Sequence, residues 1–269
     1  MNLLLTINRR YLGITYTCLH SLLRFPTRES WDIYILESDL TDEDFAELRL
    51  EFPGTGFHRV AVDEALFADY PESKNYPKQM YYRILAARLL PPELERILYI
   101  DPDTIILHSL EPLYDMPFDG CYYIACTHTG KALTKANQVR LGSEEPTPYI
   151  NSGVMMLNLT ALRENQSERE IIDYVREYGR RFILPDQDII SALYGEHIKL
   201  VDHMIYNLSD RMLNLYNADL ANEKRGLRWV CENTAVVHYC GKNKPWEDGY
   251  VGLLGVFYWE IAEFYKKLR

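Results

Sequence analysis

Apolar runs and amphipathic stretches alternate along the first hundred residues of the chain. Short aliphatic runs are typical of strands buried on both faces, whereas apolar positions three and four residues apart are typical of helices. This pattern predicts strands over 2–7, 31–38, 57–62 and 96–100. It predicts one helix over 12–23 and a second that starts after an N-cap at Thr41. A third helix is predicted over 78–90, where two prolines end it. Strands and helices that alternate in this way indicate a parallel sheet with right-handed crossovers.

The second half of the chain is less regular. The segments 121–127 and 234–239 predict strands, and an apolar segment over 149–159 follows a proline-containing loop. Helices are predicted over 160–178, from Pro185 onward, and at the C-terminus over about 250–269. No repeat, linker or shift in composition divides the chain, so we expect a single α/β domain over residues 1–269.

The composition excludes several classes of protein. The chain has 269 residues, of which 47% are hydrophobic, and a net charge of -10 that would repel the phosphates of a nucleic acid. Its five cysteines are odd in number and form no Cys-x-x-Cys pair, so we expect free thiols in the cytoplasm. No segment approaches the roughly 20 apolar residues that span a bilayer, and the N-terminal run is too short for a signal peptide. Sequons at Asn158, Asn165 and Asn207 are therefore expected to be accidental.

Two aspartates follow the strand predicted at 96–100. In the stretch ILYIDPDTIIL, only Pro102 separates Asp101 from Asp103. Ligands of open α/β sheets collect at the carboxyl ends of the strands, where we expect both side chains. Two buried carboxylates this close raise the pKa of one of them unless a cation lies between them, and Mg²⁺ or Mn²⁺ would resolve that conflict. A pair of solvated or helix-capping aspartates in a turn is the alternative from this pattern alone.

Two enzyme classes use an Asp-x-Asp pair after a buried strand. Phosphatases of the haloacid-dehalogenase type need a later Asp-Asp or Gly-Asp to complete a Mg²⁺ site, and the chain contains neither dipeptide. Nucleotide-sugar transferases use both aspartates for a metal that holds a diphosphate, and they need further motifs. Such motifs are present as Asn-Ser-Gly at 151–153, Pro-Asp-Gln-Asp at 185–188 and HYCGKNKPW at 238–246.

These motifs, together with the segments LLLTINRRYLG and YYRILAARLLP, make the chain resemble glycosyltransferase family 8. The resemblance covers nearly the whole chain, and the motifs occur in the family's order. It implies a GT-A (Rossmann-like) nucleotide-sugar transferase fold in one domain, with a mixed, mostly parallel sheet flanked by helices. It also implies retention of configuration at the transferred sugar.

The resemblance implies a metal site made by Asp101, Asp103 and His238. The imidazole nitrogen suits Mn²⁺ better than Mg²⁺. Gly241 would let the backbone approach the donor diphosphate, and Lys244 would offer it an ammonium group. Taken alone, His238 would more often be a core histidine and Lys244 a solvated turn residue.

The resemblance also assigns contacts to the donor nucleotide. Tyr11 would stack on the uracil base, and Thr6 and Asn8 would bond its polar edge. Asn8 stands where the family commonly has an acid, and Arg10 where it often has an asparagine, so the base is left open at this point. Arg83 would reach the donor site, as would Asp101, or it would form a structural salt bridge to the Asp-x-Asp segment.

The donor sugar would be held by Asn151 and Asp186, with Gln187 beneath the anomeric carbon. An amide is a poor nucleophile, so front-face departure and attack fits better than a covalent intermediate on Gln187. Asp188 is a second candidate carboxylate or a residue that caps or orients its helix. His128 is either a contact to donor or acceptor or a surface histidine.

The resemblance thus implies an enzyme that moves a hexose from UDP-glucose or UDP-galactose to a hydroxyl of a cell-surface glycan or glycolipid, as in lipopolysaccharide biosynthesis. The alternatives are a nucleotide-sugar-binding protein without transferase activity and the phosphatase. We expect the acceptor pocket in loops at 127–147 and 202–229. The aromatic C-terminal segment with Lys266, Lys267 and Arg269 is either a packed helix or a weak contact to the inner face of the membrane.

Overall fold

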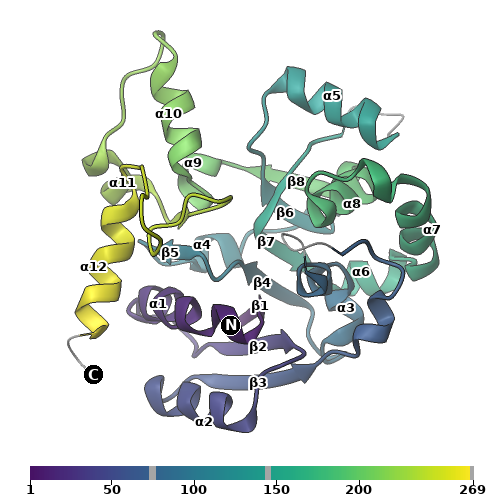
Figure 1. Cartoon of the computed structure of the whole chain (residues 1–269), viewed down its shortest axis with the longest axis horizontal. Helices are drawn as coiled ribbons and strands as arrows, with labels where there is room; N and C mark the ends of the chain where they lie inside the picture. The colour runs from purple at the N-terminus through teal and green to yellow at the C-terminus, as the bar shows by residue number, and fades with distance from the viewer. Residues whose placement is uncertain (73–76, 143–146, 267–269) are drawn as a thin grey trace.

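The computed structural model describes residues 1–72, 77–142 and 147–266. Its centre is a seven-stranded sheet in the order β3-β2-β1-β4-β7-β6-β8, which crosses the middle of Figure 1. Two further strands, β5 and β9, form a separate small sheet. The strands are β1 (Asn2–Thr6), β2 (Asp32–Glu37), β3 (Gly56–Ala61), β4 (Arg96–Ile100), β5 (Thr104–Ile106), β6 (Tyr123–Cys126), β7 (Asn151–Asn158), β8 (Ile198–Val201) and β9 (Val236–His238).

Helices cover both faces of the large sheet and surround the small one (Figure 1). Two 3₁₀ segments, η1 (Arg9–Tyr11) and η3 (Lys78–Leu85), lead into α1 and α3. The α-helices are α1 (Leu12–Leu23), α2 (Asp42–Glu51), α3 (Ala86–Leu89), α4 (Glu111–Tyr114), α5 (Lys131–Leu141), α6 (Leu159–Asn165), α7 (Glu168–Tyr178), α8 (Pro185–Tyr194), α9 (His203–Tyr206), α10 (Asp210–Ala218), α11 (Leu227–Asn233) and α12 (Gly255–Lys266).

The first four strands are parallel, as the alternating pattern predicts. β1 pairs with both β2 and β4, and β2 pairs with β3. The chain therefore moves outward from β1 in one direction and returns on its other side with β4, which creates a switch point between the carboxyl ends of β1 and β4. β7 runs antiparallel to β4 and β6, so the sheet is mixed but mostly parallel.

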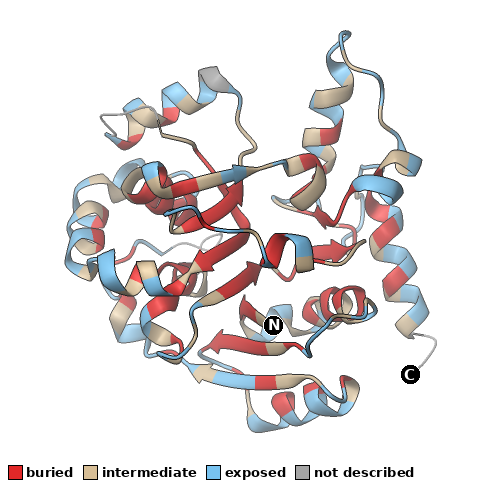
Figure 2. Ribbon diagram, turned by 180° about the vertical axis from the view of Figure 1, so that it is seen from behind, coloured by how far each residue is buried: buried red, intermediate tan, exposed pale blue. Residues whose placement is uncertain are grey.

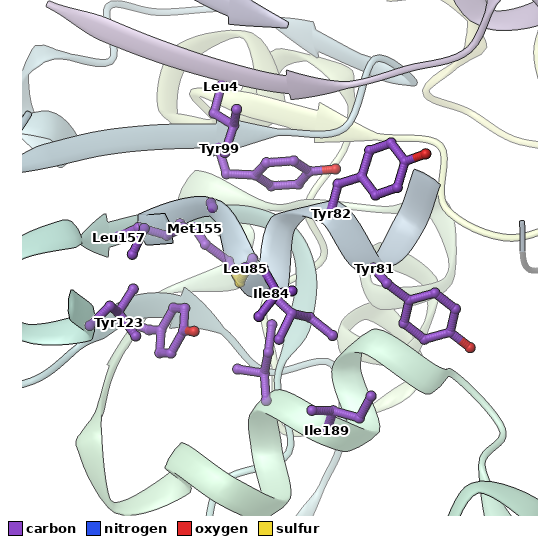
Figure 3. Close-up of a cluster of buried hydrophobic side chains, with 14 of the residues drawn as sticks. Leu4, Tyr81, Tyr82, Ile84, Leu85, Tyr99, Tyr123, Met155, Leu157 and Ile189 are labelled. Carbon is purple, nitrogen blue, oxygen red and sulfur yellow. The ribbon is translucent and has the colours of Figure 1, made fainter. Parts of the chain in front are cut away.

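The core fills both faces of the large sheet. Successive side chains of a strand point to opposite faces, and in β4 Tyr99 joins one hydrophobic cluster whereas Ile100 joins the other. Figure 3 shows the first cluster, where Tyr82 of η3 lies beside Tyr99 and Tyr81 points to the side of Ile189 of α8. The second cluster packs against α1 and α2. The strands β1, β2, β4 and β7 are buried along nearly their whole length and appear red in Figure 2, which explains their continuous apolar sequences, whereas the edge strand β3 is mostly exposed or half-buried.

The small sheet is a feature that the apolar pattern did not predict. β5 follows β4 after a turn of only three residues, in which the Thr104 hydroxyl donates to the carbonyl of Asp101 at 2.8 Å. β9, expected within 234–239, pairs antiparallel with β5. A third hydrophobic cluster, to which Ile105, Val237 and Phe257 belong, packs beneath this sheet and includes side chains of α9–α12.

Three predicted helices are corrected by the structure. Residues 78–90 form η3 and then a single turn of α3, because every side chain from Tyr81 to Leu85 is buried and its packing overrides helix propensity. The segment 160–178 forms two helices, since α6 ends before Gln166 and Ser167 starts α7 as a new N-cap. The C-terminal helix begins at Gly255 rather than near residue 250.

Two segments that were expected to be loops also contain helices. The region 127–147 holds α5, and the region 202–229 holds α9, α10 and the start of α11. At the C-terminus, α12 packs through Phe257 and Ile261, which are buried, and Lys267 and Arg269 lie outside the described residues. Membrane contact by this helix stays a prediction. Among the described residues, no helix combines the length and the apolar character that crossing a bilayer requires.

Candidate active site

Strand pairing brings the two aspartates and the histidine to one place. Asp101 and Asp103 follow β4 at the carboxyl edge of the sheet. Because β7 runs antiparallel to β4, its first residues lie beside Asp101, whose N–H donates to the carbonyl of Gly153 at 2.7 Å. Because β9 runs antiparallel to β5, its last residue, His238, pairs with Thr104. Segments far apart in the sequence therefore meet at the Asp-x-Asp turn.

Three side-chain atoms converge at this turn. His238 Nε2 lies 3.2 Å from Oδ1 of Asp103 and 3.7 Å from Oδ2 of Asp101. One ligand atom from each of the three residues lies within 4.8 Å of the others. His238 and Asp103 are buried, and Asp101 is half-buried. The structure thus brings together the three predicted metal ligands.

The second oxygen of each carboxylate is held by a cationic side chain. Arg83 Nη2 lies 3.0 Å from Oδ1 of Asp101, and Lys244 donates to Oδ2 of Asp103. Burial alone would raise the pKa of Asp103, but His238, when its imidazole is protonated, and the ammonium of Lys244 lower it below its ordinary value. The Asp103 carboxylate is therefore kept ionised, and one oxygen of each carboxylate faces the imidazole.

The cluster fits a divalent cation. His238 Nδ1 lies 2.9 Å from the amide oxygen of Asn207, which can only accept a hydrogen bond, so Nδ1 carries a proton and Nε2 is the nitrogen that can offer a lone pair to a cation. Nε2 is buried, and it has no hydrogen-bond partner among the described residues. A lone pair that faces two carboxylate oxygens is repelled by them unless a cation lies between. Two oxygens and one imidazole nitrogen are a ligand set that Mn²⁺ accepts.

Gly153 leaves the space that His238 occupies. A Cβ at this position would lie 2.1 Å from Cε1 and 2.8 Å from Nδ1 of His238. The imidazole can therefore reach the aspartates only because the third residue of the Asn-Ser-Gly motif has no side chain.

Gly153→Ala should displace the imidazole and weaken the binding of Mn²⁺. A displaced ligand should cost at least about as much as the loss of a residue that orients one, which is 10–100-fold in metal affinity. Calorimetric titration of the purified variant with Mn²⁺ measures this. Gly226→Ala is the matched control, because a Cβ there meets nothing within 4 Å. If Gly153→Ala binds Mn²⁺ as tightly as wild type does, the steric argument is contradicted.

The residues predicted to hold the donor sugar lie next to each other. Asp186 and Gln187 are in the first turn of α8, and Asn151 begins β7. Asp186 Oδ2 accepts from the hydroxyl of Ser152 at 2.6 Å. Gln187 Oε1 accepts from Asn151 Nδ2 at 3.1 Å and from the N–H of Ser152 at 3.4 Å. Side chains of α8 and the start of β7 thus form one buried polar cluster, which we call the α8 cluster.

Arg83 joins the α8 cluster to the aspartate pair. Its Nη2 lies 3.0 Å from Asp101, and its Nη1 lies 3.2 Å from Asp186. The guanidinium also lies over the ring of Tyr99, 4.4 Å from the centroid. The salt bridge to the Asp-x-Asp segment, the structural alternative for Arg83, is therefore formed, and a role toward the donor stays a prediction.

Asp188 is occupied by contacts within the fold. Its carboxylate accepts from Tyr149 at 2.7 Å, from two guanidinium nitrogens of Arg140 at 2.7 and 2.9 Å, and from the N–H of Ile183 at 2.7 Å. The side chain has no exposed surface. These contacts orient α5 against α8, which agrees with a helix-orienting role rather than a catalytic one.

The stability of the protein should carry a pH dependence from Asp186. Burial raises the pKa of this carboxyl above its ordinary value of 3.8, although Arg83 and the Ser152 hydroxyl lower it. The folded protein then holds the proton more tightly than the unfolded chain, so the stabilising contribution is full below about pH 4 and is lost as pH rises through the folded pKa. In urea unfolding, the free energy of unfolding of wild type minus that of Asp186→Asn should fall as the pH rises above about 4. A difference that grows with pH would mean that pairing with Arg83 outweighs burial.

Thr6 and Asn8, predicted to contact the base, follow β1. The hydroxyl of Thr6 lies 3.1 Å from that of Tyr99, which donates to Asp101, so Thr6 is joined to the carboxylate pair. Asn8 is the N-cap of η1, but its side chain makes no capping bond. Its Oδ1 has no hydrogen-bond partner among the described residues. Contact of both residues with a base stays a prediction.

Tyr11 and Gly241 are both exposed, and Tyr11 lies close enough to the aspartates to feel their charge. Tyr11 is 38% exposed, and burial raises its pKa, on which the charges of Lys244 and Asp103 also act. Gly241 has a φ of 85°, a left-handed conformation that favours glycine, and a Cβ there would meet nothing within 4 Å. Both positions suit the predicted contacts to base and diphosphate, which the structure leaves as predictions.

Several residues that build the site were missed by sequence reasoning. Ser152 and Gly153 lie inside a recognised motif, and Tyr99 is a polar side chain in an apolar strand, so each had a signal. Asn207 had none, because it lies in a segment expected to be a loop and was noted only as a sequon. It is fully buried. His128 donates to its carbonyl at 2.7 Å, so His128 supports the site rather than standing on the surface.

The fold and the site together define a class of protein, the glycosyltransferases of GT-A fold. Solved structures of the galactosyltransferase LgtC show the same fold. One, described as a complex with donor and acceptor sugar analogs, aligns with a TM-score of 0.82 at 18% identity and covers 98% of this chain and 96% of that chain. An active-site mutant of LgtC aligns with a TM-score of 0.84 at 20% identity and the same coverage.

The chain belongs to glycosyltransferase family 8. The family model "Glycosyl transferase family 8" matches residues 2–249. General stress protein A of Bacillus subtilis is 26% identical over 249 residues, which is 89% of this chain and 84% of that protein. A lipopolysaccharide 1,2-glucosyltransferase of Escherichia coli is 24% identical over 237 residues, or 85% of this chain and 68% of that protein. The protein is therefore a retaining glycosyltransferase, and the resemblance found in its sequence is confirmed.

Proposed function

We infer that this glycosyltransferase is metal-dependent and transfers glucose or galactose from a UDP-sugar to a hydroxyl of a glycan or glycolipid. One observation carries the proposal. The ligand atoms of Asp101, Asp103 and His238 converge beside the α8 cluster, with Arg83 between the two groups. A diphosphate docked at the first group would bring its sugar to the second.

The charged residues around the aspartates have distinct roles in this proposal. Asp101, Asp103 and His238 would hold Mn²⁺, or Mg²⁺, which when bound would act as a Lewis acid on the departing diphosphate. Lys244 now pairs with Asp103 and would turn to the diphosphate oxygens as a second positive charge. Gly241 would offer them its main-chain N–H.

The α8 cluster would place the sugar and keep water from it. Asn151 and Asp186 would bond sugar hydroxyls, and Gln187 would lie below the anomeric carbon. The amide oxygen of Gln187 already accepts from Asn151 and from the N–H of Ser152, which lowers its capacity as a nucleophile. This supports departure and attack on the same face of the sugar, with the leaving phosphate taking the proton of the acceptor hydroxyl.

Relatives supply the argument for the sugar and the acceptor. Two of them are described as a lipopolysaccharide 1,2-glucosyltransferase and a lipopolysaccharide 1,3-galactosyltransferase, so both hexoses occur among the related enzymes. From the similarity to these relatives we also propose that the acceptor is a glycan or glycolipid. We propose further that the enzyme acts in the cytoplasm and that the chain forms a single functional domain. The family match leaves the phosphatase and the binding protein without transferase activity unsupported.

A hydrolysis screen across nucleotide sugars tests the proposal without knowledge of the acceptor. UDP-glucose or UDP-galactose should be cleaved faster than GDP-, ADP- and CMP-sugars, in the presence of Mn²⁺ and not of EDTA. Cleavage that is unchanged in EDTA would overturn the metal-dependent mechanism. Preference for another nucleotide would overturn the UDP assignment. The screen includes other nucleotides because Asn8 and Arg10 differ from the residues that the family commonly has at these positions.

A further inference from the structure

A chain of hydrogen-bonded amides joins His238 to the α8 cluster. His238 Nδ1 lies 2.9 Å from Oδ1 of Asn207, and Nδ2 of Asn207 lies 2.9 Å from Oδ1 of Asn151. Nδ2 of Asn151 continues to Oε1 of Gln187 at 3.1 Å. All four side chains are buried, and Asn207 is completely so. Asn207 is the member that touches both the imidazole and the α8 cluster.

A main-chain N–H group fixes the direction of this chain. The N–H of Gly153 lies 3.1 Å from the side chain of Asn151, and because it can only donate, the atom facing it is the amide oxygen. The atom of Asn207 that faces the same oxygen must then be its NH₂. The oxygen of Asn207 is left for His238, whose Nδ1 must carry the proton. Nε2 is thereby the ring nitrogen that faces the aspartates and is available to a metal ion.

The main chain of Asn207 is held on both sides. Its N–H donates to the carbonyl of His203 at 3.1 Å, and its carbonyl accepts from Nε2 of His128 at 2.7 Å. Burial lowers the pKa of His128 to about 3, so this imidazole remains neutral and keeps a single donor for that carbonyl. The amide of Asn207 is therefore presented at a fixed place between His238 and Asn151.

We propose that Asn207 is a positioning residue that fixes the tautomer and orientation of His238 for metal binding and couples them to the α8 cluster through Asn151. This inference rests on the proposed function, because it assumes that His238 is a metal ligand. Groups that hold the second nitrogen of a ligating histidine set its tautomer and raise its basicity. Here that group is an amide whose own orientation is set by the start of β7. Removing both contacts of Asn207 should therefore change the metal affinity and the geometry of the sugar site together.

Two substitutions separate the two contacts of Asn207. Asn207→Leu removes both, and its Mn²⁺ affinity, measured by calorimetric titration without nucleotide, should fall about 10–100-fold. Asn207→Asp keeps an oxygen toward Nδ1 of His238 but sets a second oxygen against that of Asn151. This variant should keep the Mn²⁺ affinity of wild type and lose at least about 10-fold in the rate of donor hydrolysis. Asn217→Leu is the control, because Asn217 also makes two side-chain hydrogen bonds, both to Arg225 in another part of the chain.

A spectroscopic measurement tests the same idea without metal or donor. In metal-free protein labelled with ¹⁵N-histidine, the ring nitrogens of His238 should show a proton on Nδ1 in wild type and in Asn207→Asp. In Asn207→Leu they should show a mixture of tautomers or the Nε2–H form. An unchanged Nδ1–H tautomer in folded Asn207→Leu would overturn the proposal. If that variant does not fold, wild-type donor hydrolysis in Asn207→Asp would overturn it. Failure of wild type to bind Mn²⁺ would instead count against the proposed function, and the tautomer would still decide the role of Asn207.

Discussion

Asp103→Asn should lower the rate of donor hydrolysis at saturating Mn²⁺ by more than about 100-fold, since loss of a residue that merely orients a metal ligand already costs 10–100-fold. Asp103 supplies one of the three converging ligand atoms, and its other oxygen is the partner of Lys244. An uncharged amide there weakens the attraction for a cation and the ion pair at the same time. Rates with UDP-glucose and UDP-galactose, across a titration of Mn²⁺, measure the effect.

The comparison needs a carboxylate of no functional consequence. Asp173 serves, because its side chain is 62% exposed on α7, and Asp173→Asn should hydrolyse donor as wild type does. Thermal unfolding of both variants separates a chemical effect from loss of the fold. Wild-type turnover in Asp103→Asn, together with insensitivity to EDTA, would remove Asp103 from the mechanism.

Arg83→Met should cost about 3–5 kcal/mol in the free energy of unfolding, which is the usual effect of breaking a buried ion pair from one side. The guanidinium of Arg83 is buried between Asp101 and Asp186, and no other cationic side chain is described in contact with Asp186. Methionine fills much of the same space, so the loss in the free energy of unfolding should come mainly from the uncompensated negative charges and less from a cavity. Denaturant unfolding of wild type and variant at the same pH gives the difference.

A double-mutant cycle shows whether the charge is the cause. Combining Arg83→Met with Asp186→Asn removes one of the two stranded carboxylates, so the double variant should be more stable than Arg83→Met alone. Arg83→Lys keeps the charge but not the two-pronged geometry, and it should fall between wild type and Arg83→Met. Arg169→Met, at a side chain that is 92% exposed, gives the background of an arginine lost from the surface. A loss for Arg83→Met no greater than this background would refute the argument.

The parallel half of the fold could be predicted because its signal is local. β1, β2 and β4 are buried on both faces and therefore appear in the sequence as apolar runs between amphipathic segments, whereas β3, at the edge of the sheet, buries only Phe57. The N-cap at Thr41 was also readable, since the capping bonds to Asp44 lie within three residues. The 3₁₀ geometry of η3 could not be predicted from the sequence. It is set by burial of Tyr81–Leu85, which depends on residues distant in the chain.

The site shows the same division between local and distant information. The motifs predicted which residues to expect, and the structure brings Asp101, Asp103 and His238 together. No motif predicts how these residues are held in contact. The imidazole of His238 fits beside Gly153 because glycine has no side chain, and it donates a hydrogen bond to the amide of Asn207. Those features depend on the pairing of β4 with β7 and of β5 with β9, whose partners lie far apart in the chain.

The antiparallel pair of β5 and β9 has a consequence for synthesis. Asp101 and Asp103 are synthesised early, whereas His238 belongs to β9, which is translated more than a hundred codons later. A nascent polypeptide that has already folded its parallel strands could pair Asp101 with Arg83, but Asp103 would still lack His238 and Lys244. Under the proposed function, cation binding at this site would therefore require that β9 has already paired with β5.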